Sequence, residues 1–501
     1  MKWRLIWRSL KNREMQKKAF AVLFMIIIFR VLSQIPIPFA EPAQLRQVLD
    51  NIFSSQDTPQ LLSFINVLSG GAIANFSIML VGLGPYITAS IIFQLLTKAI
   101  PRLEKLQQEE GEYGRKKISQ YTRMLTLPLA IVQSIGTIFI VRQSASQFGC
   151  LGDVEPGANT GRWVLMVAAL TGGAMILMWL GELLTENGLG NGISLLITVG
   201  VVSSLPGIAG TLIGSTVTEG AKFELFGKIL PIDSRGLAVS LTILGLTLLL
   251  ILLVVFLNEA QRRIHVSYAK RVQGNRNYGG VSSVLPIKMI LAGVIPIIFA
   301  LAFLSIPSFI GGLIQNSANP TWANLGQNLG TLFQQPTAQL YASGGWQPYL
   351  YPIAYFVLVF TFTFFYTNIT FNAKDIAENL QKQGGFVADK RPGQETEKYL
   401  SKVVNNLTLY GALALSILAV MPYILLILAV NFPSLPLPTN QIQIGGTSML
   451  ILVSVALETL RQIESKALML TYDDYNSVTG VENSYNPKSK NFLKKVFTRG
   501  R

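Results

Sequence analysis

Residues 61–94 read LLSFINVLSGGAIANFSIMLVGLGPYITASIIFQ, and this stretch decides how the rest of the chain is interpreted. A short apolar segment stops at Ser69-Gly70-Gly71, and a membrane-length apolar segment follows with its own weak point at Gly82-Leu83-Gly84-Pro85. Lipid tolerates broken backbone only where it is buried in protein or lines a cavity, because unpaired amides in hydrocarbon cost several kcal/mol each. We therefore expect something hollow or mobile at the centre of this protein.

The composition indicates a membrane protein. Half of the residues are apolar and only 13% are charged, whereas roughly 25% of the residues in a soluble domain are charged. The single cysteine, Cys150, excludes a disulfide within the chain and a cluster of thiolate metal ligands. The single histidine, His265, leaves little for acid-base or metal chemistry near neutral pH. We therefore expect no metal, no cofactor and no enzymatic activity.

Apolar segments long enough to cross a bilayer recur along the chain. A helix needs roughly 20 mostly apolar residues to span the hydrocarbon core. By this measure the sequence predicts ten spans and leaves the short segment 61–70 over. The fold class is therefore an all-α polytopic membrane protein. We place the spans at 19–38, 73–97, 122–142, 162–182, 191–210, 237–258, 289–311, 349–371, 404–430 and 446–466.

The positive charge predicts the orientation of these spans. With the amino terminus inside, cytoplasmic segments contain 34 of the 41 Lys and Arg residues, and the external loops contain four. Such a bias follows the positive-inside rule and places both termini in the cytoplasm. Residues 1–18 mix aromatic residues with cations and are typical of an interfacial amphipathic helix. Residues 467–501 form a basic cytoplasmic tail.

Ten spans divide into two sets of five with opposite orientation in the membrane. The expected division is an N-terminal half over 19–236 and a C-terminal half over 237–466. An inverted pair of this kind places a central path where the halves meet. A secondary transporter of a small solute shares this plan, but it needs a binding site at the midplane, usually an acidic one.

Seven sequence segments, in order and over most of the length, resemble the SecY family of central subunits of the bacterial protein-conducting channel. The resemblance implies two five-helix halves around a central pore with a short plug helix and a lateral gate. It also implies that unfolded secretory polypeptides pass through and that membrane segments leave sideways into lipid. The segments are SGGAIANFSIMLVGLGPYITASIIFQLL from residue 69, EEGEYGRKKISQYTR at 109–123, GLGNGISLLI at 188–197, EAQRRIHVSYAKR at 259–271, AGVIPIIFA at 292–300, FVADKRPGQET at 386–396 and GGTSMLI at 445–451.

The resemblance assigns a pore ring and a plug. Leu83 and Ile87 are four residues apart and share a helix face, although aliphatic pairs at this spacing occur on every membrane helix. The plug would be residues 61–75, and without the resemblance this segment could equally be a re-entrant filler that never moves. The residues that match the pore ring are Leu83, Ile87, Ile197, Ile298 and Ile451. Those of the plug are Leu61, Phe64, Leu68, Ser69, Gly70 and Gly71.

A polar residue and a proline suggest the lateral gate. Gln94 lies in an apolar run, and Pro296 would remove a backbone hydrogen bond inside the span at 289–311. A polar side chain and a freed carbonyl on opposed helices suit a seam that opens to lipid. The alternative is ordinary polar contact between packed helices.

Two long basic loops, 261–280 and 382–398, predict docking surfaces on the cytoplasmic side. Their length suggests that they project, whereas a basic face that merely obeys the positive-inside rule would explain the charge alone. By resemblance they would dock a translating ribosome or the motor ATPase SecA, without reading nucleic acid directly. The docking residues are Arg262, Arg263, Lys270, Arg271, Arg276 and Arg391.

The resemblance also implies companions and a location. Small SecE-type and SecG-type subunits would accompany the chain, and lipid would surround it. The expected location is the inner, plasma membrane of a bacterium, and a plastid thylakoid membrane is the second possibility.

Overall fold

The computed structural model describes most of the chain. Its described residues are 13–37, 77–109, 111–146, 160–186, 191–216, 223–225, 228–230, 234–268, 271–273, 276–278, 282–315, 319–387, 390–432 and 450–466. The predicted plug at 61–75, the segment 1–12 and the tail 467–501 lie outside these residues.

Each of the ten predicted spans overlaps a helix among the described residues. Six of these helices are long and apolar enough to cross a membrane by themselves: α7, α8, α10, α11, α14 and α16. In the N-terminal half the helices are α2 (Arg13–Leu32), α5 (Gly84–Ala99), α6 (Pro101–Glu109), α7 (Gly111–Ser146), α8 (Thr160–Glu186) and α9 (Gly192–Thr216). In the C-terminal half they are α10 (Ser234–Glu259), α11 (Ile295–Ile314), α12 (Pro320–Leu332), α13 (Ala338–Ala342), α14 (Gln347–Thr370), α15 (Ala373–Lys382), α16 (Gln394–Asn431) and a last helix over 450–466.

The predicted helix at 73–97 is wrong at its start, because residues 77–83 form turns and α5 begins only at Gly84. Gly82 has a φ of 63°, a conformation that glycine adopts without strain. The preceding residues are held from two sides. The Ile78 amide donates to the Ile35 carbonyl over 3.0 Å, and α8 approaches so closely that a Cβ on Gly173 would lie 1.9 Å from the Ile78 carbonyl oxygen.

Strands join the two basic loops, which the sequence analysis did not predict. An antiparallel sheet of order β6-β3-β7 combines β3 (Gln261–Tyr268), β6 (Ser282–Lys288) and β7 (Gly385–Val387). Val266 of the first loop pairs with Val387 of the second. Buried residues of this sheet pack on α16, so the two loops form one body. Two hairpins complete the strands: β1 (Phe223–Leu225) with β2 (Lys228–Leu230), and β4 (Arg271–Gln273) with β5 (Arg276–Tyr278).

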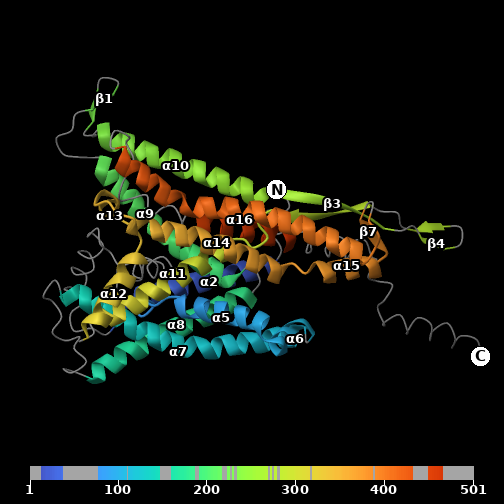
Figure 1. Ribbon diagram of the computed structural model, residues 1–501, viewed down its shortest axis with the longest axis horizontal. Coiled ribbons are helices and arrows are strands. Elements are labelled where there is room, and N and C mark those ends of the chain that lie inside the picture. The colour runs from blue at the N-terminus through green and yellow to red at the C-terminus, as the bar shows by residue number, and fades with distance from the viewer. Residues whose placement is uncertain are drawn as a thin grey trace, which may run out of the picture.

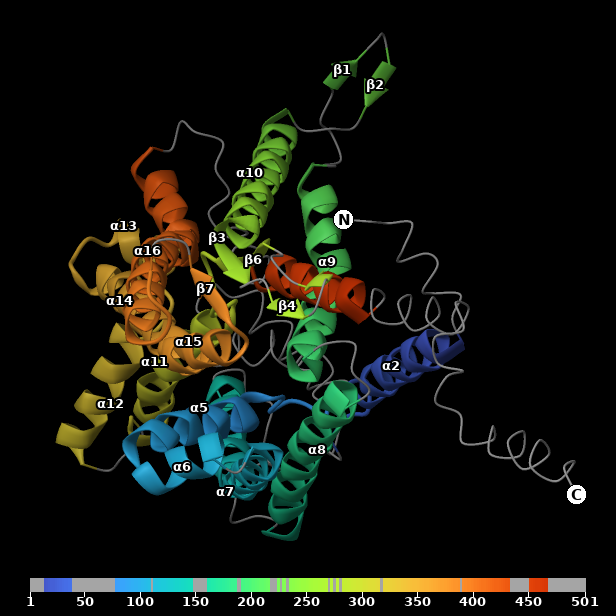
Figure 2. The ribbon, with the colours of Figure 1, turned by 90° about the vertical axis from the view of Figure 1, so that its right-hand side faces the viewer.

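The elements from the predicted cytoplasmic loops lie at one end of the molecule. Figure 1 shows α6, α15, β4 and β7 together at that end, and β1, α12 and α13 at the other. The alternation of the ten spans predicts this separation. Figure 2 shows α5 to α8 gathered on one side of the molecule and α10, α14, α15 and α16 on the other. Between these groups lies one apolar cluster of buried residues from both halves of the chain.

Candidate functional site

The five residues that were predicted for the ring all lie in one buried apolar cluster. Leu83 ends the turn before α5, and Ile87 lies on the first turns of that helix. The other three, Ile197, Ile298 and Ile451, belong to α9, α11 and the last helix. All five are between 1% and 6% exposed and belong to a single cluster of packed residues.

This burial differs sharply from that of side chains on the outer surface of the helices. Leu252 and Phe256 on α10 are 68% and 70% exposed. Those positions suit contact with lipid, whereas the five ring positions face inward. The five side chains, which come from α5 with its preceding turn, α9, α11 and the last helix, are therefore part of the buried interior.

Asn191 and Gly192 determine where α9 begins and how closely it packs, and α9 carries the ring residue Ile197. The Asn191 side chain accepts a hydrogen bond from the Ile193 amide over 3.1 Å, which caps the start of the helix. Gly192 lies against α8, where a Cβ would stand 2.1 Å from the Gly181 carbonyl oxygen. Gly192 thus permits a close approach of α8 and α9, the helix that carries Ile197.

The buried interior contains little that could bind an ion or a charged solute. Among the residues whose side chains the structure describes, the buried polar ones are Ser and Thr, and none is Asp, Glu, Lys or Arg. The described residues also contain no group of three His, Cys, Asp or Glu side chains that could hold a metal ion. The buried residues that the structure describes are therefore apolar or carry hydroxyl groups.

Gln94 lies on α5, which packs directly against α11. Its side-chain nitrogen donates to the Ser90 hydroxyl over 3.2 Å, on the same helix. Its Oε1 atom is buried and accepts no hydrogen bond from the residues that the structure describes. An unsatisfied buried acceptor costs on the order of 1–3 kcal/mol. This cost weakens the packing around Gln94 relative to a fully satisfied or apolar contact.

The structural reason that was predicted for Pro296 is wrong. The span expected at 289–311 does not begin at Met289, because residues 282–288 form β6 and α11 begins at Ile295. Pro296 therefore lies in the first turn of α11, where the amide that it lacks would have no partner within the helix. It starts the helix and does not break it. Gly293, with a φ of 60°, makes the turn that precedes it.

The described docking residues lie on three supports: β3, the β4–β5 hairpin and the turn before α16. Arg262 and Arg263 are exposed on β3, and the backbones of Arg271 and Arg276 belong to the β4–β5 hairpin. Lys270 lies outside the described residues. The hairpin projects away from the helices at the end of the molecule that holds α15 (Figure 1).

Arg391 is presented by a defined turn before α16. Its backbone amide donates to the Glu395 carboxylate over 3.2 Å, and its carbonyl accepts from the Thr396 hydroxyl over 2.8 Å. Gly393 has a φ of 99°, so Pro392 and Gly393 fix the chain direction here.

Two ion pairs that the sequence analysis missed fasten helices together near the basic end. Arg123 of α7 contacts Glu182 of α8 at 2.7 Å, and Arg461 of the last helix contacts Glu259 of α10 at 2.6 Å. Nearby, burial lowers the pKa of Lys288 on β6, and the Arg461 charge lowers it further. Acidic and basic residues at helix ends gave a signal for these contacts, but their pairing depends on which helices are neighbours.

The segment 312–348, which contains no charged residue, has a defined structure over its described residues. It forms α12 and α13, and α12 packs closely on α11. Gly326 lies at their contact, where a Cβ would stand 2.5 Å from the Gln315 amide nitrogen. The loop therefore rests against the helix that carries Ile298.

These features define a class: a multi-pass helical membrane protein in which spans from both halves of the chain close an aliphatic centre above a basic end. The chain belongs to the SecY family, whose family model matches residues 77–460. It is 38% identical to the protein translocase subunit SecY of Corynebacterium glutamicum over 93% of this chain and 98% of that protein.

Solved structures show the same fold at lower identity. One, described as the structure of a protein conducting channel, matches with a TM-score of 0.59 and 18% identity over 89% of this chain and 90% of the other. Another, Sec61 in the canine ribosome-channel complex from the endoplasmic reticulum, has a TM-score of 0.56 and 17% identity over the same 89% and 90%. The predicted family and ten-span channel fold are confirmed, and the comparisons favour a protein-conducting channel over a small-solute transporter.

Proposed function

We propose that this chain is the pore-forming subunit of a Sec-type translocase and that unfolded polypeptides pass through its aliphatic centre. The observation that carries the proposal is the convergence of five aliphatic side chains, from α5, the turn before it, α9, α11 and the last helix, into one buried cluster. The protein-conducting role of its relatives supplies the substrate class.

The chemistry of the ring suits a conduit that must pass any sequence. Aliphatic side chains offer neither a hydrogen bond nor a charge that would retain the moving chain. A narrow apolar constriction also resists ions, because water leaves it readily. The five side chains are buried in one apolar cluster, so under this proposal a passing polypeptide would have to push them apart. The plug at 61–75 would add a second seal on the external side.

The seam between α5 and α11 is the proposed lateral gate. The two helices belong to different halves of the chain and pack against each other. The unsatisfied Oε1 atom of Gln94 lowers the stability of the packing around α5. Separation of α5 from α11 would open the centre sideways, and an apolar segment of the passing chain could then enter lipid.

The basic end is the proposed docking surface for a translating ribosome or a SecA-type ATPase. In the chain, the β4–β5 hairpin follows β3 and the Arg391 turn follows β7; because β3 and β7 pair in one sheet, a partner could engage both loops at once. SecE-type and SecG-type subunits would complete the assembly. The proposed location is the bacterial inner membrane, with the basic end and both termini in the cytoplasm, because 34 of the 41 cations fall on that side.

Crosslinking tests the passage of polypeptide through the ring. In a chain with Cys150 replaced by serine, single cysteines replace Leu83, Ile197 or Ile451, and a matched control replaces Leu252 on the outer surface of α10. A stalled secretory chain carrying a thiol-reactive probe should crosslink to all three ring positions and not to the control. Crosslinks that favour the Leu252 position, or that miss two of the three ring positions, would refute the proposed path.

A further inference from the structure

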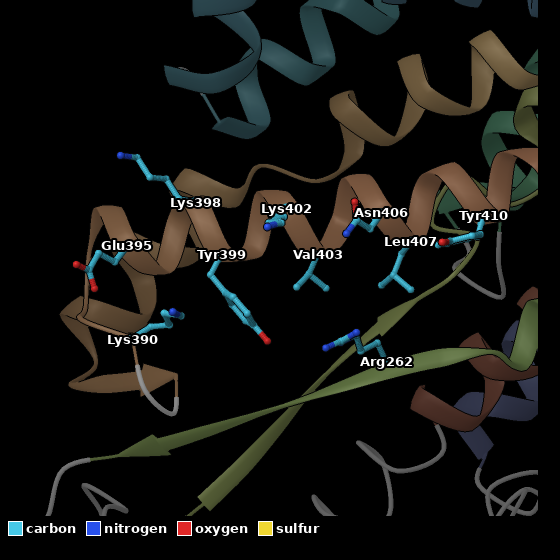
Figure 3. Close-up of a pocket in the computed structure, with 10 residues that line it drawn as sticks. All are labelled: Arg262, Lys390, Glu395, Lys398, Tyr399, Lys402, Val403, Asn406, Leu407 and Tyr410. Carbon is cyan, nitrogen blue, oxygen red and sulfur yellow. The ribbon is translucent and has the colours of Figure 1, made fainter.

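A basic groove lies between β3 and the first turns of α16. It has a volume of about 690 Å³, and its lining includes Arg262 from the strand and Lys398, Lys402 and Tyr399 from the helix. Figure 3 shows Arg262 on the strand side of the groove and the Tyr399 ring directed from the helix toward that side. Val403 and Leu407 line the side of the groove where the helix faces the strand.

The groove carries an excess of positive charge. Four cations line it, Arg262, Lys390, Lys398 and Lys402, against the single carboxylate of Glu395. That carboxylate already accepts a hydrogen bond from the Arg391 amide at the start of α16. Within the described part of the chain, none of the four cations forms an ion pair. The groove therefore favours an anion.

The groove continues into an apolar surface of the same helix. Lys402, Asn406, Tyr410, Leu413 and Ile417 follow one another at intervals of three or four residues, so they share one face of α16. The first three line the groove. The last three are between 45% and 64% exposed and lie within the span predicted at 404–430. A single stripe thus leads from the cations to the membrane-facing side of the helix.

We propose that this groove binds an anionic phospholipid of the leaflet at the basic end. The phosphate would lie between Arg262 and Lys402, because a guanidinium can bind phosphate oxygens through two hydrogen bonds. Tyr410 would lie at the boundary between headgroup and hydrocarbon, where tyrosine is common. The acyl chains would follow Leu413 and Ile417. A soluble anion would contact the cations alone, whereas a phospholipid would contact both the cations and the apolar residues of the stripe.

Lipid binding to the purified full-length chain in detergent tests the proposal by native mass spectrometry. Phosphatidylglycerol, neutral phosphatidylcholine and glycerol phosphate are each titrated against the chain. We expect retention of phosphatidylglycerol only. In the double variant R262Q/K402Q, the affinity for the most tightly bound phosphatidylglycerol molecule should fall by a factor on the order of ten or more. Each cation near a lipid surface contributes to the attraction of an anionic lipid. The single variant K402Q, which changes one exposed side chain, should show an intermediate loss.

The matched control is K374Q/K382Q, which removes two exposed lysines from α15 at the same end of the molecule and outside the groove. It should bind phosphatidylglycerol as the unaltered chain does. Equal binding by R262Q/K402Q and this control would overturn the proposal. Equal retention of phosphatidylcholine, or of glycerol phosphate without acyl chains, would overturn it too. In the complete translocase, a photoreactive residue at Tyr410 that crosslinks to a partner subunit and to no lipid would also overturn it.

Discussion

The centre of the molecule and its basic end are stabilised in different ways. At the centre, aliphatic side chains from distant parts of the chain pack together and remain 1–6% exposed. At the basic end, strand pairing between two loops holds exposed arginines such as Arg262 and Arg263 above a small apolar core. Changes at the centre should therefore affect the seal for every substrate, whereas changes at the end should affect partners and leave the seal intact.

The largest effect should come from a charge at the centre. In the variant L83E, a carboxylate would enter a cluster of apolar side chains at a position that is 1% exposed. Burying an unpaired charge costs several kcal/mol or forces the site to open to water. We expect either loss of folded protein or a constitutive ion conductance, measured by yield after detergent extraction and by planar-bilayer recording.

The control for this experiment is L83M, which conserves volume and apolar character and should cost less than about 1.5 kcal/mol. A folded L83E protein that seals the bilayer as well as L83M does would mean that Leu83 does not face the closed centre.

A smaller loss of stability and of the ion seal should come from a substitution on α8 that displaces the turn before Leu83. In G173A, the new methyl group on α8 would lie 1.9 Å from the Ile78 carbonyl oxygen and would displace the turn that leads to Leu83. Such overpacking costs about 1–3 kcal/mol. We expect a lower temperature of thermal unfolding in detergent together with a measurable ion leak.

The neighbouring residue supplies a matched control for G173A. A Cβ on Gly172 would meet nothing within 4 Å, and alanine is favoured over glycine in a helix by roughly 1 kcal/mol. G172A should therefore be neutral or slightly stabilising. Similar losses in the two variants would show that the turn at 77–83 does not depend on the close approach of α8.

The sequence predicted the centre better than the basic end. Ten apolar segments and their charge bias were sufficient for the spans, because burial in lipid leaves a strong signal in composition. The spacing of Leu83 and Ile87 predicted a shared face. The expectation that they share a ring with Ile197, Ile298 and Ile451 came from family resemblance alone, because tertiary packing of separate helices leaves no local pattern.

The strands at the basic end were missed although a signal existed. Residues 263–268 alternate polar and apolar side chains, with Ile264 and Val266 buried and His265 exposed. This alternation is typical of a half-buried strand. Its pairing with Gly385–Val387 could not be inferred, because that strand has only three residues and lies far away in the chain. Pro296 was misinterpreted for a different reason: within a continuous apolar run, the sequence does not distinguish the start of a helix from its interior.

A third prediction concerns the basic end alone. R391E should reduce translocation driven by a SecA-type partner while the ion seal and the insertion of this chain stay unchanged, because Arg391 is exposed and lies away from the apolar centre. The measurement is the initial rate of translocation into vesicles, with K374E on α15 as the charge-matched control. An unchanged rate in R391E, or an equal loss in K374E, would remove Arg391 from the docking surface.

The smallest effect should be a pH dependence near Lys288, where the basic end meets the helices. Burial, with a further contribution from Arg461, lowers the pKa of Lys288 below its ordinary value of 10.5. At a pH between the lowered pKa of the folded state and 10.5, the unfolded chain binds more protons than the folded one. This lysine therefore reduces stability most at neutral pH and less as pH rises toward 10.5.

The variant K288M removes this pH-dependent loss of stability. The stability gap between K288M and the unaltered chain, measured by thermal unfolding in detergent, should therefore narrow as pH rises. R461Q removes a repelling charge and should move that narrowing to higher pH. A gap that is constant with pH would mean that Lys288 remains as well hydrated in the folded protein as in the unfolded chain.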